Sequence, residues 1–208
     1  MVEKNYSEHA LESIALNVIK QYNPSLLYGT PRAIPIEDII EKQYGLKIEY
    51  QHIRKNGELL GETIFGDMWV PIYDKESEEY TMISVKKGTI IIDAGLLNGV
   101  NDGRLRFTCA HELAHWLIHK DVYSGSEKLA NMLNLAGVKH SEYSIMEKQA
   151  DSLGSSLLMP AGRVKAAYYS LSGTMAHKGK TETIEMLSEQ FDVSKQAMEI
   201  RLKTCKLI

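Results

Sequence analysis

The sequence predicts an α+β fold, with helices toward both ends of the chain and a small sheet between them. Three observations indicate this class: helical spacing of apolar residues before residue 46, alternating or β-branched stretches over 46–95, and helical spacing again from residue 102 onward. The 208 residues suffice for one domain with a hydrophobic core, and they contain no internal repeat or low-complexity segment. We expect residues 1–208 to form a single domain.

Two helices are expected first. Apolar residues recur at helical spacing over 9–21, and Asn23-Pro24 ends that segment. Pro35 then begins a second helix, which has acidic residues in its first turn and Gly45 as its end.

Strands are expected in the middle of the chain. The candidate segments alternate in polarity or are rich in β-branched residues, and they cover 46–53, 61–74, 80–85 and 89–95. Asn56-Gly57 and Lys87-Gly88 mark turns between them. These short segments predict a small, mostly antiparallel sheet.

Helices return in the remainder of the chain. Helical spacing predicts them at about 103–119, 127–137, 144–159, 183–191 and 194–203. Pro160 stops the third of these, and the Ser-Gly pairs near 124–126 and 172–173 indicate loops within one domain.

Composition excludes several classes of function. The net charge of −3 is unlike that of a protein that binds nucleic acid by bulk electrostatics. We find no signal peptide and no apolar stretch long enough to span a bilayer. Two cysteines, Cys109 and Cys205, are too few for a disulfide framework. These features favour a cytoplasmic protein that does not associate with membranes.

The strongest functional signal is an HExxH motif, His111-Glu112-Leu113-Ala114-His115, on a predicted helix. Residues four apart lie about 40° apart around a helix and about 6 Å apart along it, so both imidazoles can reach one metal ion. Apolar residues occupy the opposite side of the helix, where Cys109 is expected as a small buried side chain. The motif predicts a zinc site in which Glu112 is the general base.

A catalytic zinc site needs a third protein ligand. His119 lies about 12 Å along the helix axis from His111, too far to share an ion, so we interpret it as a helix-end residue favoured by the helix dipole. Glu147 is the better candidate, on the later helix whose small residues would let it approach the first. Asp151 follows one turn later and is placed to accept the free N–H of a ligating histidine.

Several segments together resemble the ImmA/IrrE metallopeptidases. RFTCAHELAHWLIH resembles the family's RFT-x-AHE-x-GH-x-x-x-H block, EKQADSLGSSLLMP its E-x-x-AN-x-F-A-x-x-LLMP block, and LSEQFDVSKQAMEIRL its C-terminal segment. The likeness covers residues 10–205. It departs from the family pattern mainly at Ala114, Asp151, Leu153 and Gly154, none of which is a proposed ligand.

The resemblance implies a compact zincin-like domain with N-terminal helices, a small sheet, the HExxH helix and C-terminal helices. By motif match it also implies metal ligands at His111, His115 and Glu147, with Glu112 as base. Family members cleave helix-turn-helix repressors of phages, mobile elements or stress regulons, so a protein substrate of that kind is expected. Manganese or iron are alternatives to Zn²⁺.

Other assignments stay open at this stage. An oxyanion stabiliser is expected, for which Tyr143, His140 and Tyr168 are candidates. Residues 181–208 resemble a helix-turn-helix, but from Thr181 onward they carry five acidic and four basic residues, so we expect them to pack on the domain or meet a protein partner rather than DNA. The alternative function is a non-catalytic metal-binding regulator or a DNA-binding protein. The sequence does not predict the oligomeric state.

Overall fold

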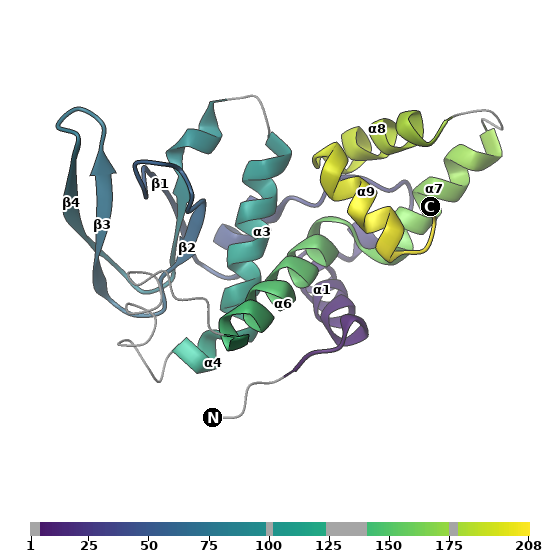
Figure 1. Cartoon of the computed structure of the whole chain (residues 1–208). Coiled ribbons are helices and arrows are strands. Elements are labelled where there is room, and N and C mark those ends of the chain that lie inside the picture. Colours follow the sequence, from purple (N-terminus) through teal and green to yellow (C-terminus); the bar gives the residue numbers. More distant parts are fainter. Residues whose placement is uncertain (1–4, 99–101, 124–140, 175–178) are drawn as a thin grey trace.

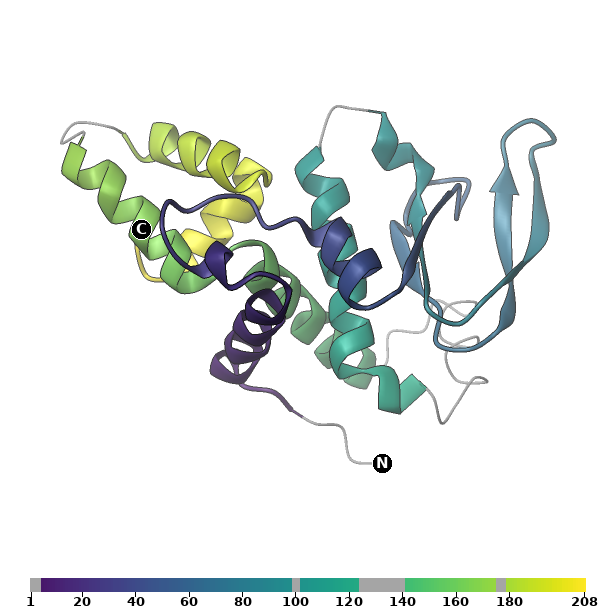
Figure 2. The same ribbon diagram turned by 180° about the vertical axis from the view of Figure 1, so that it is seen from behind.

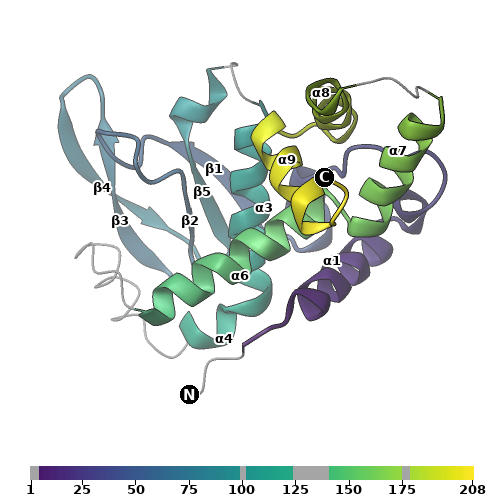
Figure 3. The ribbon, with the colours of Figure 1, turned by 45° about the vertical axis from the view of Figure 1, so that its right-hand side comes forward.

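The computed structural model describes residues 5–98, 102–123, 141–174 and 179–208 of the chain. Helices come first, strands follow, and helices return, in the order that the sequence predicts. Figures 1 and 3 show the strands on one side of helix α3 and most of the other helices on its opposite side. The predicted α+β fold class is confirmed.

The N-terminal helices begin and end at capping residues. Helix α1 (Glu8–Tyr22) begins where the hydroxyl of Ser7 accepts the backbone N–H of Ala10, and it ends at Asn23. A 3₁₀ turn η1 (Pro24–Leu27) follows. The second predicted helix is shorter than expected: α2 (Ile36–Asp38) continues as a π-helical turn, η2 (Ile39–Gln43), before Gly45 takes a positive φ.

A three-stranded sheet has the order β1-β5-β2, formed by Lys47–Gln51, Thr89–Asp93 and Gly61–Thr63. Strand β1 is parallel to β5, whereas β2 is antiparallel to it. Strands β3 (Met68–Asp74) and β4 (Glu79–Val85) form a separate antiparallel ribbon. Two of the three strand pairings among the described residues are therefore antiparallel, as the sequence predicts.

The predicted continuous strand over 61–74 is wrong, because it is divided between the two sheets. The chain bends at Gly66-Asp67, where the Asp67 carboxylate accepts the backbone N–H of Lys87 at 2.9 Å and forms an ion pair with Lys86 at 2.8 Å. These bonds hold the bend next to the turn before β5, so β2 stays with β5 and β3 leaves to pair with β4.

Strand β5 is buried on both faces, which explains its unbroken β-branched sequence. Ile90 and Ile92 belong to the main core, which also contains the buried sides of α1, α3 and α6. Ile91 points the other way into a small cluster with Ile53, Ile64, Val70 and Val85, which lies between the sheet and the ribbon. The sheet therefore connects the ribbon to the helical core.

Helix α3 (Asp102–Ile118) packs across α6 (Ser141–Leu158), and α1 packs on α6 in turn (Figure 2). The short helix α4 (Lys120–Tyr123) follows α3. A Cβ atom on Gly154 would lie only 3.1 Å from the backbone nitrogen of His111, so the two helix backbones are in near contact. The predicted close approach of the two helices through small residues is confirmed.

The C-terminal region contains a helix that the sequence analysis did not predict, α7 (Ala161–Thr174). Pro160 ends α6 but also begins α7, since its carbonyl accepts the N–H groups of Arg163 and Val164. Helices α8 (Lys180–Phe191) and α9 (Lys195–Thr204) follow. The helix expected at 127–137 lies outside the described residues.

Helices α8 and α9 are joined by a tight turn in which Asp192 is left-handed and the Ser194 hydroxyl caps α9. Arg106 of α3 donates to the carbonyl of Asp192 at 3.0 Å. Arg201 of α9 donates to the carbonyl of Met159 at 2.8 Å and to the Glu12 carboxylate at 2.5 Å. This segment therefore contacts α1, α3 and the end of α6, in agreement with the arrangement in Figure 3.

Among the described residues, no helix combines the length and the apolar character that crossing a membrane requires.

Candidate metal centre

His111 and His115 lie one turn apart on the same face of α3, as their spacing predicts. Their Nε2 atoms are 3.0 Å apart, and their ring centroids are 4.7 Å apart. The side chains are 16% and 8% exposed, so both are held between helices rather than extended into solvent. The motif therefore presents two imidazole nitrogens at one point.

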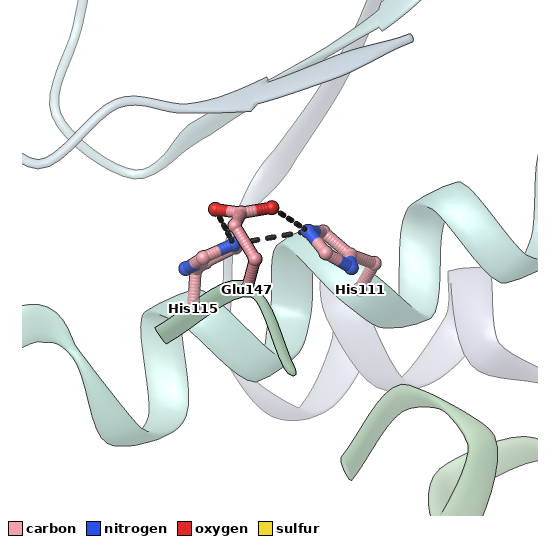
Figure 4. Close-up of side chains that lie close together, drawn as sticks. All are labelled: His111, His115 and Glu147. Atoms are coloured by element: carbon pink, nitrogen blue, oxygen red, sulfur yellow. Dashed lines mark hydrogen bonds and ion pairs between the residues drawn. The ribbon is translucent and has the colours of Figure 1, made fainter. Parts of the chain in front are cut away.

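Glu147 reaches the same point from α6 (Figure 4). One carboxylate oxygen lies 3.2 Å from Nε2 of His111, and the other lies 3.3 Å from Nε2 of His115. One ligand atom from each of the three residues lies within 4.8 Å of the other two. The structure thus brings together the three residues that the sequence singles out as ligands.

The spacing of these atoms fits a tetrahedral metal ion. Ligands that lie about 2.0–2.1 Å from a tetrahedral ion are about 3.3 Å from one another. The two Nε2 atoms, 3.0 Å apart, are close to that value, and they lie 3.2 and 3.3 Å from two different oxygens of the Glu147 carboxylate. Two imidazoles and one carboxylate are also a donor set that proteins use for such ions.

Asp151, one turn beyond Glu147 on α6, contacts the outer ring nitrogen of His111. Its Oδ1 lies 2.9 Å from Nδ1 of His111. When this Nδ1 carries the proton and donates to the carboxylate, Nε2 of His111 keeps its lone pair toward Glu147 and His115. The geometry matches the partnership expected from the sequence.

Charge coupling shifts the pKa values of this group. Burial alone would lower the pKa of His111, but hydrogen bonds to Asp151 and Glu147 outweigh it and raise that pKa to about 10. Burial alone would raise the pKa of Glu147, but the two histidines hold it well below its usual range. Without a metal the His111 ring is therefore protonated on both nitrogens at neutral pH. A metal ion that binds must displace the proton on the nitrogen it occupies.

Glu112 is buried and held by the edge strand β2. The Thr63 hydroxyl lies 2.7 Å from Oε2 of Glu112 and 2.9 Å from its backbone carbonyl, so it can donate to either. A Cβ atom on Gly61 would lie 2.8 Å from Oε1 of the same carboxylate, so any larger residue there would have to displace that side chain. The negative charge of Glu112 also helps to raise the pKa of His111. Thr63 and Gly61 are partners that the sequence analysis missed, since they lie about fifty residues upstream in an edge strand.

His119 lies at the end of α3, as expected, but its expected stabilisation by the helix dipole is wrong. His119 is 2% exposed, its Nδ1 lies 3.0 Å from Nδ1 of His115, and its Nε2 lies 3.1 Å from Oε1 of Gln149. Burial and the neighbouring His115 lower the pKa of His119 to about 4, so the ring is neutral. Helix α6 covers this end of α3, so contacts with a second helix determine the environment of His119.

Of the three candidates for an oxyanion stabiliser, the structure describes the side chain of Tyr168. The side chains of Tyr143 and His140 lie outside the described residues. Tyr168 lies on α7, which follows the C-terminal end of α6, whereas Glu147 lies in the N-terminal half of α6 (Figures 1 and 3). The Tyr168 ring packs against Tyr169 and the main core.

Cys109 is fully buried, as expected from its side of α3. Burial raises the pKa of its thiol well above the usual range. It belongs to the hydrophobic core that supports the metal centre from behind.

Comparison with known proteins agrees with this site. Residues 96–203, just over half of the chain, match the model of the IrrE N-terminal-like domain, peptidase M78. The chain belongs to this family of metallopeptidases. No curated protein matches the chain.

One similar solved structure is a Mycobacterium tuberculosis transcriptional regulator, with a TM-score of 0.51 at 12% sequence identity. The match covers 95% of this chain and 47% of the regulator, so this chain spans about half the length of that protein. At this identity the likeness concerns the fold, and it agrees with the zincin-like domain that the resemblance implies.

Proposed function

We propose that this protein is a zinc-dependent endopeptidase. His111, His115 and Glu147 would hold the zinc ion, and Glu112 would be the general base. The observation that carries the proposal is the convergence of three ligand atoms within 4.8 Å, with the Glu112 carboxylate on the turn between the two histidines. Three protein ligands leave a fourth coordination position for the reaction, as in catalytic rather than structural zinc sites.

Zinc is preferred over manganese or iron because two imidazoles and a single carboxylate suit it best. When bound, zinc would supply the acidification of a water molecule and the polarisation of the scissile carbonyl. The protein's own part is proton transfer: Glu112 would take a proton from the attacking water and deliver it to the amine that leaves. The Thr63 hydroxyl, 2.7 Å from Oε2 of Glu112, would hold this carboxylate in position for the transfer.

We further propose that the substrate is a helix-turn-helix transcriptional repressor of a phage, mobile element or stress regulon. Family membership supports proteolysis, and the name of the similar regulator supports a connection with transcription. A repressor substrate would place the reaction in the cytoplasm. DNA binding by the chain itself is disfavoured, because the segment from Thr181 onward has more acidic than basic residues.

Metal content tests the first half of the proposal. We expect about one zinc per native chain by elemental analysis and little in Glu147→Ala. Glu189→Ala is the matched control, because it removes an exposed glutamate from α8 and should retain zinc. Equal zinc in all three proteins would remove Glu147 from the ligand set, and no zinc in native protein after zinc is added back would refute the metal centre.

Cleavage tests the second half. Purified native protein, loaded with zinc, is incubated with a repressor encoded beside it, and fragments are followed by mass spectrometry. Glu112→Gln should retain zinc and lose cleavage, since the amide cannot accept the proton from water. Normal cleavage by that variant would disprove the role of Glu112. Zinc binding without cleavage of any such repressor would instead favour a non-catalytic metal-binding regulator.

A further inference from the structure

A chain of buried polar side chains extends inward from the metal centre, on the side opposite to Asp151. Nδ1 of His115 lies 3.0 Å from Nδ1 of His119, and Nε2 of His119 lies 3.1 Å from Oε1 of Gln149. His115, His119 and Gln149 are 6%, 2% and 5% exposed, so water has little access to these bonds. Two helices contribute to the chain, with His119 directly after α3 and Gln149 on α6.

The positions of the protons along these side chains follow from the chemistry of the last one, Gln149. The amide oxygen of Gln149 can only accept, so Nε2 of His119 must carry the proton and donate it. A neutral His119 then has a bare Nδ1, which accepts a proton from Nδ1 of His115. His115 is thereby left with a lone pair on Nε2, the atom that faces Glu147 and His111.

The opposite orientation of the Gln149 amide would place the proton of each histidine on its other ring nitrogen. Its NH₂ group would then donate to His119, His119 would donate to His115, and Nε2 of His115 would be protonated and unable to bind a metal. The other atom of the same amide, Nε2 of Gln149, donates to Oδ1 of Asn5 at 3.4 Å, which agrees with this orientation. With Gln149 oriented in this way, the proton of His115 lies on Nδ1 and its Nε2 lone pair faces Glu147 and His111.

We infer that His119 and Gln149 are positioning residues that fix His115 in its metal-binding tautomer and ring orientation. The inference rests on the proposed metal centre and goes beyond it, because it assigns a role to two residues that neither bind the ion nor touch substrate. The two ligating histidines are thus oriented differently. A carboxylate, Asp151, orients His111, whereas a neutral histidine and amide orient His115.

The first test needs no variant. In zinc-loaded native protein, ¹⁵N-labelled histidine spectra identify which ring nitrogen of each histidine carries a proton. We expect His119 to be neutral with its proton on Nε2, and His115 to carry its proton on Nδ1. A proton on Nδ1 of His119 would overturn the inference. Absence of zinc binding by native protein would instead be a failure of the proposed function, so the two failures are distinguishable.

The second test measures zinc affinity by competition with a chromophoric chelator. His119→Leu removes the acceptor for His115 and should weaken zinc binding by about 10–100-fold. His119→Gln offers a side-chain carbonyl as acceptor and should restore part of that loss. The matched control is His9→Leu, which removes an exposed histidine from α1 and should bind zinc as the native protein does.

If His119→Leu does not fold, Gln149→Met tests the same inference. It keeps the length of the side chain but removes the acceptor for His119, and it should also weaken zinc binding, whereas Gln149→Glu should retain near-native affinity. Native affinity in folded His119→Leu or folded Gln149→Met would refute the inference, although the metal centre itself would stand.

Discussion

Replacing Gly103 with alanine tests how closely the C-terminal segment is docked on the rest of the chain. We propose that residues 181–208 are an integral part of one domain that spans 1–208, and Gly103 lies at the contact between them. A Cβ atom at this position would lie 2.4 Å from the backbone nitrogen of Ser194 and 2.6 Å from the carbonyl carbon of Val193. Ordinary contacts of a Cβ atom begin near 3.4 Å.

The size of the effect follows from that overlap. Both clashing atoms belong to the backbone, so the α8–α9 turn must move away from α3 by roughly 1 Å, the shortfall from ordinary contact. Overpacking of this kind costs about 1–3 kcal/mol. The movement would also weaken the bond from Arg106 to the carbonyl of Asp192, worth about 1 kcal/mol, while alanine returns up to about 1 kcal/mol of helix propensity. The last two contributions roughly offset each other, so we expect a net loss of about 1–3 kcal/mol.

Thermal unfolding followed by circular dichroism measures this loss. For a chain of this size about 1–3 kcal/mol corresponds to a fall in Tm of roughly 2–12 °C. Gly162→Ala on α7 is the matched control, since its Cβ would meet no atom within 4 Å and should leave the Tm unchanged or slightly raised. All samples need the same zinc concentration, because a bound metal adds to stability. A Gly103→Ala variant as stable as the native protein would refute the close docking.

Three further outcomes are expected. Gly61→Ala should lower peptide cleavage at least about tenfold without loss of zinc, because its Cβ would lie 2.8 Å from the Glu112 carboxylate, and unchanged cleavage would contradict that contact. Asp151→Ala should weaken zinc binding by about 10–100-fold in chelator competition, and native affinity would show that His111 needs no such partner. In the native protein a thiol reagent should modify half-buried Cys205 long before Cys109, which is fully buried with a raised pKa, and equal rates would argue against that burial.

The strand region shows where pattern alone was insufficient. The segments 46–53 and 89–95 were recognised by their composition, but their pairing is parallel, and no local feature of either segment specifies a partner. The segment 61–74 looked continuous because its polarity pattern continues through Gly66-Asp67. Its division depends on bonds from Asp67 to residues near 86–87, which adjoin β5 and are remote in sequence.

At the candidate metal centre, too, some relations follow from local sequence and others depend on tertiary packing. His111 and His115 share a face because the α-helix repeats every 3.6 residues, and the sequence alone determined that relation. That Glu147 meets them was inferred from a motif, but the contact itself depends on α6 crossing α3 at small residues. The position of His119 at the end of α3 follows from the sequence, whereas its contact with Gln149 depends on how α6 packs there.

The sequence by itself determined the class of fold, the location of most helices, and the pair of histidines with the glutamate between them. Each of these depends on backbone periodicity and on residue preferences that act over a few neighbours. The tertiary structure alone decided which strands pair, that β2 packs on the Glu112 carboxylate, and that His119 and Gln149 are buried behind His115. These contacts join residues that are tens of positions apart, so they depend on how complete helices and strands pack, which no local pattern encodes.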